Sequence, residues 1–238
     1  MKKNIVLLLT AVMGFAVLAG CAGGTKNSTA SVEMTGNGTQ SSADTDTETG
    51  SAAKTGAAQA DAGTVSFDWL PAGVEQQKAE TEHNEELQKL ITEYYEIPDY
   101  ELADSRYYYN YVDLDSDGEN EIFAVVVGSY TSGSGGSFAL WCAEQDGELV
   151  VKQAFTLVNM PVIVVDNEDG GAKDLILERS GGGAETEYVM LTCADGVYTN
   201  VSDAETVSGS DLQNVQGVAI LCNDLAEDMQ TGNYLTLE

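Results

Sequence analysis

The chain has 238 residues, with 39 acidic against 10 basic ones, so its formal net charge at pH 7 is -29. This acidity excludes nucleic acid as a partner, because proteins that bind a phosphate backbone neutralise it with Lys and Arg. It favours metal ions as ligands and argues against close contact between the protein surface and anionic lipid.

The start of the chain is typical of a bacterial secretory signal. Lys2 and Lys3 precede an apolar run over 5–18 that is too short to span a membrane comfortably. The run ends in Leu-Ala-Gly-Cys, which resembles the lipobox of bacterial lipoproteins. The resemblance implies cleavage before Cys21, lipidation of that thiol, and anchoring to the cell membrane on its extracytoplasmic face, or to an outer membrane where the cell has one. An ordinary secreted protein or an uncleaved anchor is the alternative.

Composition then divides the chain into three parts. Residues 1–20 are the predicted lipoprotein signal peptide. Residues 21–63 are rich in Ala, Gly, Ser and Thr with scattered acids, and such a segment buries too little apolar surface to offset its ordering entropy. We expect this segment to be a disordered acidic tether. Residues 64–238 are long enough for a single globular domain.

Two helices are expected in this domain. The first covers residues 84–95, where apolar side chains recur at helical spacing after Asn84, a plausible N-cap; these side chains are Leu87, Leu90, Ile91 and Tyr94. A second, short helix starts at Asp224 with a sequence that resembles a capping box, and ends by Gly232.

The rest of the domain favours extended structure. Runs rich in β-branched and aromatic residues alternate with Gly, Asn and Asp turns, and they predict strands at 107–112, 122–128, 137–143, 149–157, 161–165, 174–178, 187–193 and 217–222. The predicted fold is therefore α+β, a mostly antiparallel β-sheet with one N-terminal helix and a short C-terminal helix.

The segment between the first two strands concentrates the residues that imply a specific chemistry. Asp113, Asp115 and Asp117 occupy loop positions one, three and five, Gly118 position six and Glu121 position nine. One tight loop can thus converge four carboxylates, which repel each other unless a cation neutralises them. Calcium accepts six to eight oxygen ligands in flexible geometry, so we expect calcium rather than magnesium. A plain acidic β-turn is the alternative.

The loop differs from an EF-hand, which needs a Glu at position twelve and flanking helices. Position twelve is Ala124, and both flanks favour strands. With the last ligand at position nine, the loop resembles the strand-loop-strand calcium sites of FG-GAP and VCBS-type repeats, although those usually carry Asp where this chain has Glu. The resemblance implies a backbone carbonyl ligand from Glu119 and side-chain ligands from Asp113, Asp115, Asp117 and Glu121.

A weaker copy of this loop follows 53 residues later, where Asp166, Glu168, Gly171 and Asp174 correspond to Asp113, Asp115, Gly118 and Glu121. Gly170 stands in place of Asp117, so the copy lacks one carboxylate. It is either a second metal site or a plain turn. Two such units fall short of a full propeller, which needs four or more blades.

Two glycine-rich loops, 131–137 and 180–183, lack the lysine of a phosphate-binding loop. They are either hairpin turns or part of a recognition surface. The order of the acidic loop, the Gly-rich loop, Pro161, residues 173–175 and the second Gly-rich turn resembles a family of bacterial envelope proteins. That resemblance implies no known activity.

Cys142, Cys193 and Cys222 remain after lipidation. They allow one disulfide with three pairings, and the repeat sets Cys142 and Cys193 at equivalent strand positions. We favour buried thiols that act as small hydrophobes, because each lies within an apolar run.

These observations favour a non-enzymatic binding or interaction module that calcium stabilises, with an envelope protein, a glycan or a small solute as its partner. A cell-wall glycan hydrolase that uses paired carboxylates such as Glu185 and Glu187 is the alternative, and a structural spacer is a third possibility. Consecutive tyrosines at 107–109 form either an aromatic binding surface or alternate core and surface positions of one strand.

Overall fold

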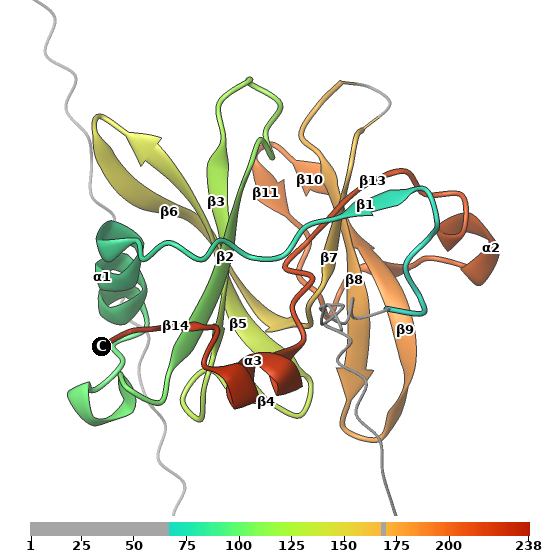
Figure 1. Cartoon of the computed structure of the whole chain (residues 1–238). Helices are drawn as coiled ribbons and strands as arrows, with labels where there is room; N and C mark the ends of the chain where they lie inside the picture. Colours follow the sequence, from blue (N-terminus) through green and yellow to red (C-terminus); the bar gives the residue numbers. More distant parts are fainter. Residues whose placement is uncertain (1–66, 168–169) are drawn as a thin grey trace, which may run out of the picture. The chain divides into compact units, whose positions relative to one another are not determined.

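A computed structural model describes residues 67–167 and 170–238 (Figure 1). The predicted signal peptide 1–20, the tether 21–63 with Cys21, and Glu168 lie outside the described residues. Among the residues that are described, no helix combines the length and the apolar character that a membrane crossing requires.

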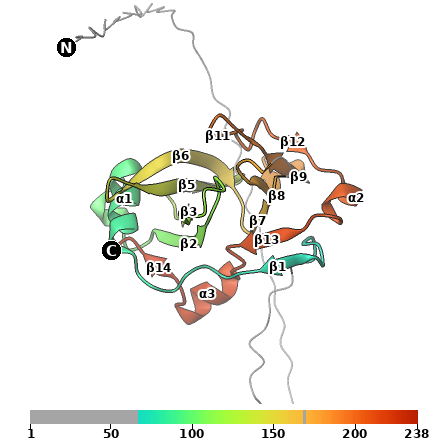
Figure 2. The same cartoon turned by 90° about the horizontal axis from the view of Figure 1, so that it is seen from above.

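Two six-stranded β-sheets form the body of the described domain (Figure 2). The first sheet follows the order β14-β2-β3-β5-β4, with β6 paired to β5. Its strands are β2 (Arg106–Val112), β3 (Glu121–Val127), β4 (Ser132–Gly133), β5 (Gly136–Gln145), β6 (Glu148–Val158) and β14 (Leu235–Thr236).

The second sheet follows the order β1-β13-β7-β8-β9-β12. Its strands are β1 (Val74–Gln76), β7 (Val162–Val165), β8 (Asp174–Gly181), β9 (Ala184–Leu191), β12 (Glu205–Thr206) and β13 (Gly217–Ile220). Only β1 and β13 pair in parallel among the described strands. A separate two-stranded ribbon joins β10 (Cys193–Ala194) to β11 (Val197–Tyr198).

The helical elements lie outside the two packed sheets (Figure 2). They are α1 (Glu85–Tyr94), the 3-10 turn η1 (Asp99–Glu101), α2 (Gly209–Leu212) and α3 (Leu225–Thr231). As the sequence predicts, the side chain of Asn84 accepts a hydrogen bond from the N–H of Leu87 at the start of α1. Asp224 caps α3 in the same way, and Gly232 ends that helix in the left-handed conformation. The predicted α+β class with mostly antiparallel strands is therefore confirmed, and the described residues form no full propeller.

Alternating side chains of the strands fill separate cores, because successive residues of a strand point to opposite faces. Phe123, Val125 and Trp141 of the first sheet share the central core with Leu175 and Leu177 of the second. On the outer face of the first sheet, α1 contributes Leu87 and Ile91 to a second core. The outer face of the second sheet has its own core, to which Trp69, Ile176 and Leu212 belong. Both sheets are thus covered on both faces.

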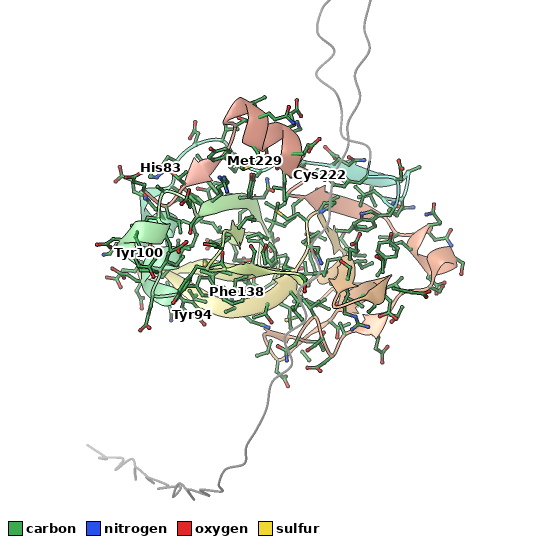
Figure 3. The ribbon with its side chains drawn as sticks, turned by 90° about the horizontal axis from the view of Figure 1, so that it is seen from below. His83, Tyr94, Tyr100, Phe138, Cys222 and Met229 are labelled. Atoms are coloured by element: carbon green, nitrogen blue, oxygen red, sulfur yellow. The ribbon has the colours of Figure 1, made fainter. Side chains whose placement is uncertain are left out.

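This double coverage decides between the two interpretations of the tyrosine run. Tyr107, Tyr108 and Tyr109 are 0%, 3% and 2% exposed, so neither the aromatic surface nor the alternation of core and surface is correct. Tyr108 faces the central core, while Tyr107 and Tyr109 face α1. The tyrosines that do reach the surface include Tyr94 at the end of α1 and Tyr100 in η1 (Figure 3).

The sequence repeat corresponds to two hairpins with the same register. Val112 pairs with Glu121 across β2 and β3, and Val165 pairs with Asp174 across β7 and β8. Each of these pairs is displaced from its counterpart by 53 residues, as the sequence predicts. Each hairpin belongs to a different sheet, and the two loops, 113–120 and 166–173, lie at the same end of the sandwich (Figure 1).

Beyond the hairpins, the predicted equivalence of Cys142 and Cys193 is wrong. Cys142 lies opposite Ile122. The counterpart of Ile122 in the repeat is Leu175, and the residue opposite Leu175 is Leu191, not Cys193. The turn between β8 and β9 is shorter than the connection from β3 to β5, so the third strands of the two units align with a different offset. The three cysteines of the described part are free thiols. Cys142 and Cys222 are buried, as favoured from the sequence, whereas Cys193 is only half-buried.

Candidate metal site

The loop 113–120 closes the hairpin of β2 and β3 and folds back through its own polar groups. The N–H of Gly118 donates to Asp113 Oδ2 at 3.2 Å, and the N–H of Glu119 donates to Asp117 Oδ1 at 2.8 Å. Ser116 and Gly118 both have positive φ, of 62° and 92°, so the left-handed turn expected at Gly118 is present. These contacts turn the aspartate side chains toward the inside of the loop.

Four carboxylates meet inside the loop. One oxygen from each lies within 4.8 Å of the others, and the residues concerned are Asp113, Asp115, Asp117 and Glu121. Glu121, at the start of β3, is buried, while Asp117 is exposed. Four of the five predicted metal-site residues are therefore brought together by their side chains. The fifth, Glu119, was expected to contribute only its backbone carbonyl, and it lies in the exposed part of the loop.

Two of these carboxylates have an oxygen with no partner. Asp113 Oδ1 and Asp115 Oδ1 are buried and accept no hydrogen bond from any described group. Burying a carboxylate oxygen without a partner is costly. The loop thus holds acceptor capacity that the described protein atoms do not satisfy.

The other oxygens of the cluster have defined partners. Glu121 Oε2 accepts the N–H of Leu114 at 2.8 Å, and Asp115 Oδ2 accepts from Lys152 Nζ at 2.7 Å. Lys152 comes from the neighbouring strand β6, and its ammonium also lies 4.7 Å from the centre of the Trp141 ring. The sequence alone does not indicate Lys152 as a neighbour of this cluster. The available signal was a single lysine within a largely apolar strand.

Electrostatics within the cluster follow from this arrangement. Burial raises the pKa of the Glu121 carboxyl, and the nearby charges of Asp115 and Asp117 raise it further, while the N–H of Leu114 acts in the opposite direction. The hydrogen bond to Asp115 raises the pKa of the Lys152 ammonium. The protein atoms thus hold more negative charge at the loop than one lysine neutralises.

A cavity of about 450 Å³ opens beside the cluster. Its lining is mainly acidic and combines loop residues with the ends of β5 and β6, namely Asp115, Asp117, Glu119, Asn120, Glu121, Ala143, Glu144, Asp146 and Lys152. A cation that enters this cavity reaches the carboxylates directly from solvent.

The second loop has a different arrangement. Lys173 Nζ pairs with Asp166 Oδ1 at 3.0 Å within that loop. Asp174 Oδ1 is buried without a partner, and burial raises the pKa of this carboxyl. Within the described ranges, which do not include Glu168, only the first loop gathers three or more potential metal ligands. The second metal site therefore has no geometric support from Asp166 and Asp174.

The two loops contact each other. The N–H of Lys173 donates to the carbonyl oxygen of Leu114 at 2.8 Å, and Ser116 Oγ donates to the carbonyl oxygen of Gly171 at 2.9 Å. In addition, the hydroxyl of Tyr198 donates to the carbonyl oxygen of Lys173 at 2.6 Å. The second loop thus supports the backbone of the first.

The remaining candidates take structural positions. The two Gly-rich loops meet at the other end of the sandwich, where a Cβ on Gly181 would overlap the backbone of Ser134 and Gly135. This close approach favours the interpretation as hairpin turns. Glu185 is exposed on β9, and Glu187 Oε2 accepts from Arg179 Nη2 at 2.7 Å. Glu187 is thus the ion-pair partner of an arginine.

In comparisons with protein-family models, curated proteins and solved structures, nothing matches this chain.

Proposed function

We propose that residues 113–121 bind one calcium ion, which stabilises an extracytoplasmic interaction domain anchored to the membrane through a lipid on Cys21. The observation that carries the proposal is the convergence of four carboxylates in one loop, where two buried oxygens have no partner. A cation in the loop would supply that partner and neutralise like charges that otherwise repel each other.

The donor set favours calcium over magnesium. The loop offers only oxygen ligands, and four of them are carboxylates. Calcium accepts such a set at varied angles, whereas magnesium requires a near-ideal octahedron and retains several waters. A transition metal would normally be held with His or Cys ligands, and none belongs to the cluster.

The location and the partner class rest on the sequence. The lipobox and the apolar run before it favour an extracytoplasmic lipoprotein, and the excess of acidic residues argues against a nucleic-acid partner. The partner would be another envelope protein, a glycan or a small solute. The lipid anchor is testable by labelling cells with a palmitate analogue, which the unmodified chain should incorporate and Cys21→Ala should not. Absence of the label from the unmodified chain would contradict the anchor.

The metal site is tested by thermal unfolding of the soluble chain that lacks residues 1–21, in chelator, calcium or magnesium. Binding to the folded state alone stabilises by about 2.7 kcal/mol when the ligand is at a hundred times its Kd. We expect calcium to raise the unfolding midpoint more than magnesium does. The variant Asp113→Asn with Asp117→Asn should lose the shift, while keeping the ion pair between Lys152 and Asp115.

A matched control separates coordination from general charge effects. The variant Glu144→Gln with Asp146→Asn removes two charges from the lining of the same cavity but none from the cluster. It should keep the calcium-dependent shift. Equal loss of the shift in both double variants, or no shift in the unmodified chain, would contradict a site built by the loop.

A further inference from the structure

Lys152 occupies an irregular position in its strand. Along β5 and β6, Cys142 pairs with Val151, and the preceding residue Trp141 pairs with Gln153. Lys152 is therefore the extra residue of a β-bulge. Bulges re-aim a side chain and often lie next to functional sites. Here the bulge accompanies a lysine whose ammonium reaches a carboxylate of the acidic cluster.

The contacts of this ammonium are specific. It lies 2.7 Å from Asp115 Oδ2 and 4.7 Å from the ring centre of Trp141, and the Lys152 side chain is only 34% exposed. Lys152 is the only basic residue that lines the acidic cavity. One carboxylate oxygen of the cluster is thus already bound to a cation that belongs to the protein.

We propose that Lys152 sets the affinity of the loop for calcium: its ammonium holds Asp115 in the metal-free protein and leaves that carboxylate when calcium binds. This inference rests on the proposed calcium site. A calcium ion bound through the free Oδ1 of Asp115 repels an ammonium that lies 2.7 Å from Oδ2 of the same carboxylate. This repulsion favours displacement of Lys152, and the energy of the lost ion pair lowers the affinity.

The surroundings provide alternatives for the displaced side chain. Glu144 and Asp146 line the same cavity, and neither belongs to the carboxylate cluster. The stem of a lysine is long and flexible, so the ammonium can move toward these acids while the backbone of β6 stays in place. Calcium thus replaces Lys152 as the counter-charge of Asp115 and leaves the sheet intact.

The first test compares calcium affinities by isothermal titration calorimetry. Lys152→Met removes the internal cation and keeps an apolar stem, so it should bind calcium about three- to tenfold more tightly than the unmodified protein. Lys89→Met is the matched control, because Lys89 on α1 also forms an ion pair with a glutamate but does not line the cavity. It changes the net charge equally and should leave the affinity within about twofold.

The outcomes distinguish the two proposals. If Lys152→Met binds calcium as tightly as Lys89→Met or more weakly, Lys152 does not limit the affinity and the inference is wrong. If neither the unmodified protein nor the variants bind calcium, the calcium site itself is wrong. Thermal unfolding adds a second test. In chelator, Lys152→Met should unfold at a lower temperature than the unmodified protein. In saturating calcium, the unfolding midpoints of the two proteins should become similar.

A spectroscopic test leaves Lys152 in place. The chain contains two tryptophans, so Trp141 is the single tryptophan of the variant Trp69→Phe. A phenylalanine ring at position 69 can still stack on Tyr188, as the ring of Trp69 does. If calcium moves the ammonium away from Trp141, the fluorescence of this variant should change on titration, with a midpoint that matches the calorimetric Kd. Calcium binding without a fluorescence change would overturn the proposed displacement.

Discussion

The two hairpin loops follow strand pairs of the same register, but their acidic side chains are neutralised differently. In the second loop, Lys173 pairs with Asp166, and glycine replaces the third aspartate. In the first loop, three aspartates and a glutamate converge, and the lysine that contacts Asp115 comes from β6. The hairpin itself therefore tolerates either arrangement. The convergence of carboxylates comes from the loop side chains, not from the strands that hold them.

The backbones of the two loops differ as well. Positive φ occurs at Ser116 and Gly118 in the first loop, whereas in the described part of the second it occurs at Gly170. Gly170 is the counterpart of Asp117, so the backbone turns at a different place. Among the described residues, the acids of the second loop form no cluster of three or more potential metal ligands, unlike those of the first loop.

The largest expected effect comes from the glycines at opposite ends of these hairpins. Gly181 has φ of 114°, and a Cβ there would overlap the backbone of the other Gly-rich turn. We expect Gly181→Ala to destabilise the protein by about 3 kcal/mol. Gly118 has φ of 92° but open space around it, so Gly118→Ala should cost only about 1 kcal/mol. Urea unfolding in chelator measures both.

Equal losses of unfolding free energy in Gly181→Ala and Gly118→Ala would contradict the expected difference between these two positions. They would mean that the contact between the two Gly-rich turns relaxes easily, and that only backbone conformation matters. The same result would reopen the interpretation of these turns as an adaptable recognition surface.

An intermediate effect is expected from Asp174, the counterpart of Glu121. Burial raises its pKa in the folded protein, so folding favours the protonated form. This group therefore contributes stability below its unfolded pKa of about 3.9, and the contribution is lost as the pH rises through its higher folded value. Asp174→Asn, which stays neutral, should raise the unfolding midpoint at pH 7 and have little effect at pH 4.

The response of Asp174→Asn should be the same in chelator and in calcium, because Asp174 lies outside the metal cluster. Asp166→Asn is the control, since its side chain is 89% exposed and no burial penalty exists to remove. A gain from Asp174→Asn that vanishes in calcium would place Asp174 within the metal site.

The smallest effect is expected from the lysine of the second loop. Lys173→Met breaks an ion pair with an exposed partner, and such pairs contribute little, so the loss should be below about 0.5 kcal/mol. Its effect on calcium affinity should be much smaller than that of Lys152→Met. A similar gain in affinity from both lysine variants would mean that general charge, and not contact with Asp115, controls the site.

Much of the fold was predictable because its strands obey simple local rules. The runs at 122–128, 137–143 and 161–165 match β3, β5 and β7 closely, since β-branched or aromatic residues fill them and Gly, Asn or Asp residues lie near their ends. The convergence of four carboxylates in the first loop was also predictable, because their spacing within one tight turn fixes which side chains can meet. The short strands β1, β12 and β14 were missed, since two or three residues carry no periodic signal.

Contacts between distant segments account for the remaining differences. Lys152 reaches Asp115 through a bulge, and a bulge depends on the pairing of two strands rather than on either sequence. The burial of Tyr107 and Tyr109 depends on α1, which covers a face that alternation alone would leave to solvent. The connections after β3 and β8 differ in length, so Cys142 and Cys193 do not occupy equivalent positions in their strands.

The most direct test of the central claim counts calcium ions per chain by equilibrium dialysis. The account predicts one ion per chain in the unmodified protein and in Asp166→Asn with Asp174→Asn, and none in Asp113→Asn with Asp117→Asn. No bound calcium in the unmodified protein, or one ion retained after the first loop is altered, would contradict the assignment of calcium to residues 113–121.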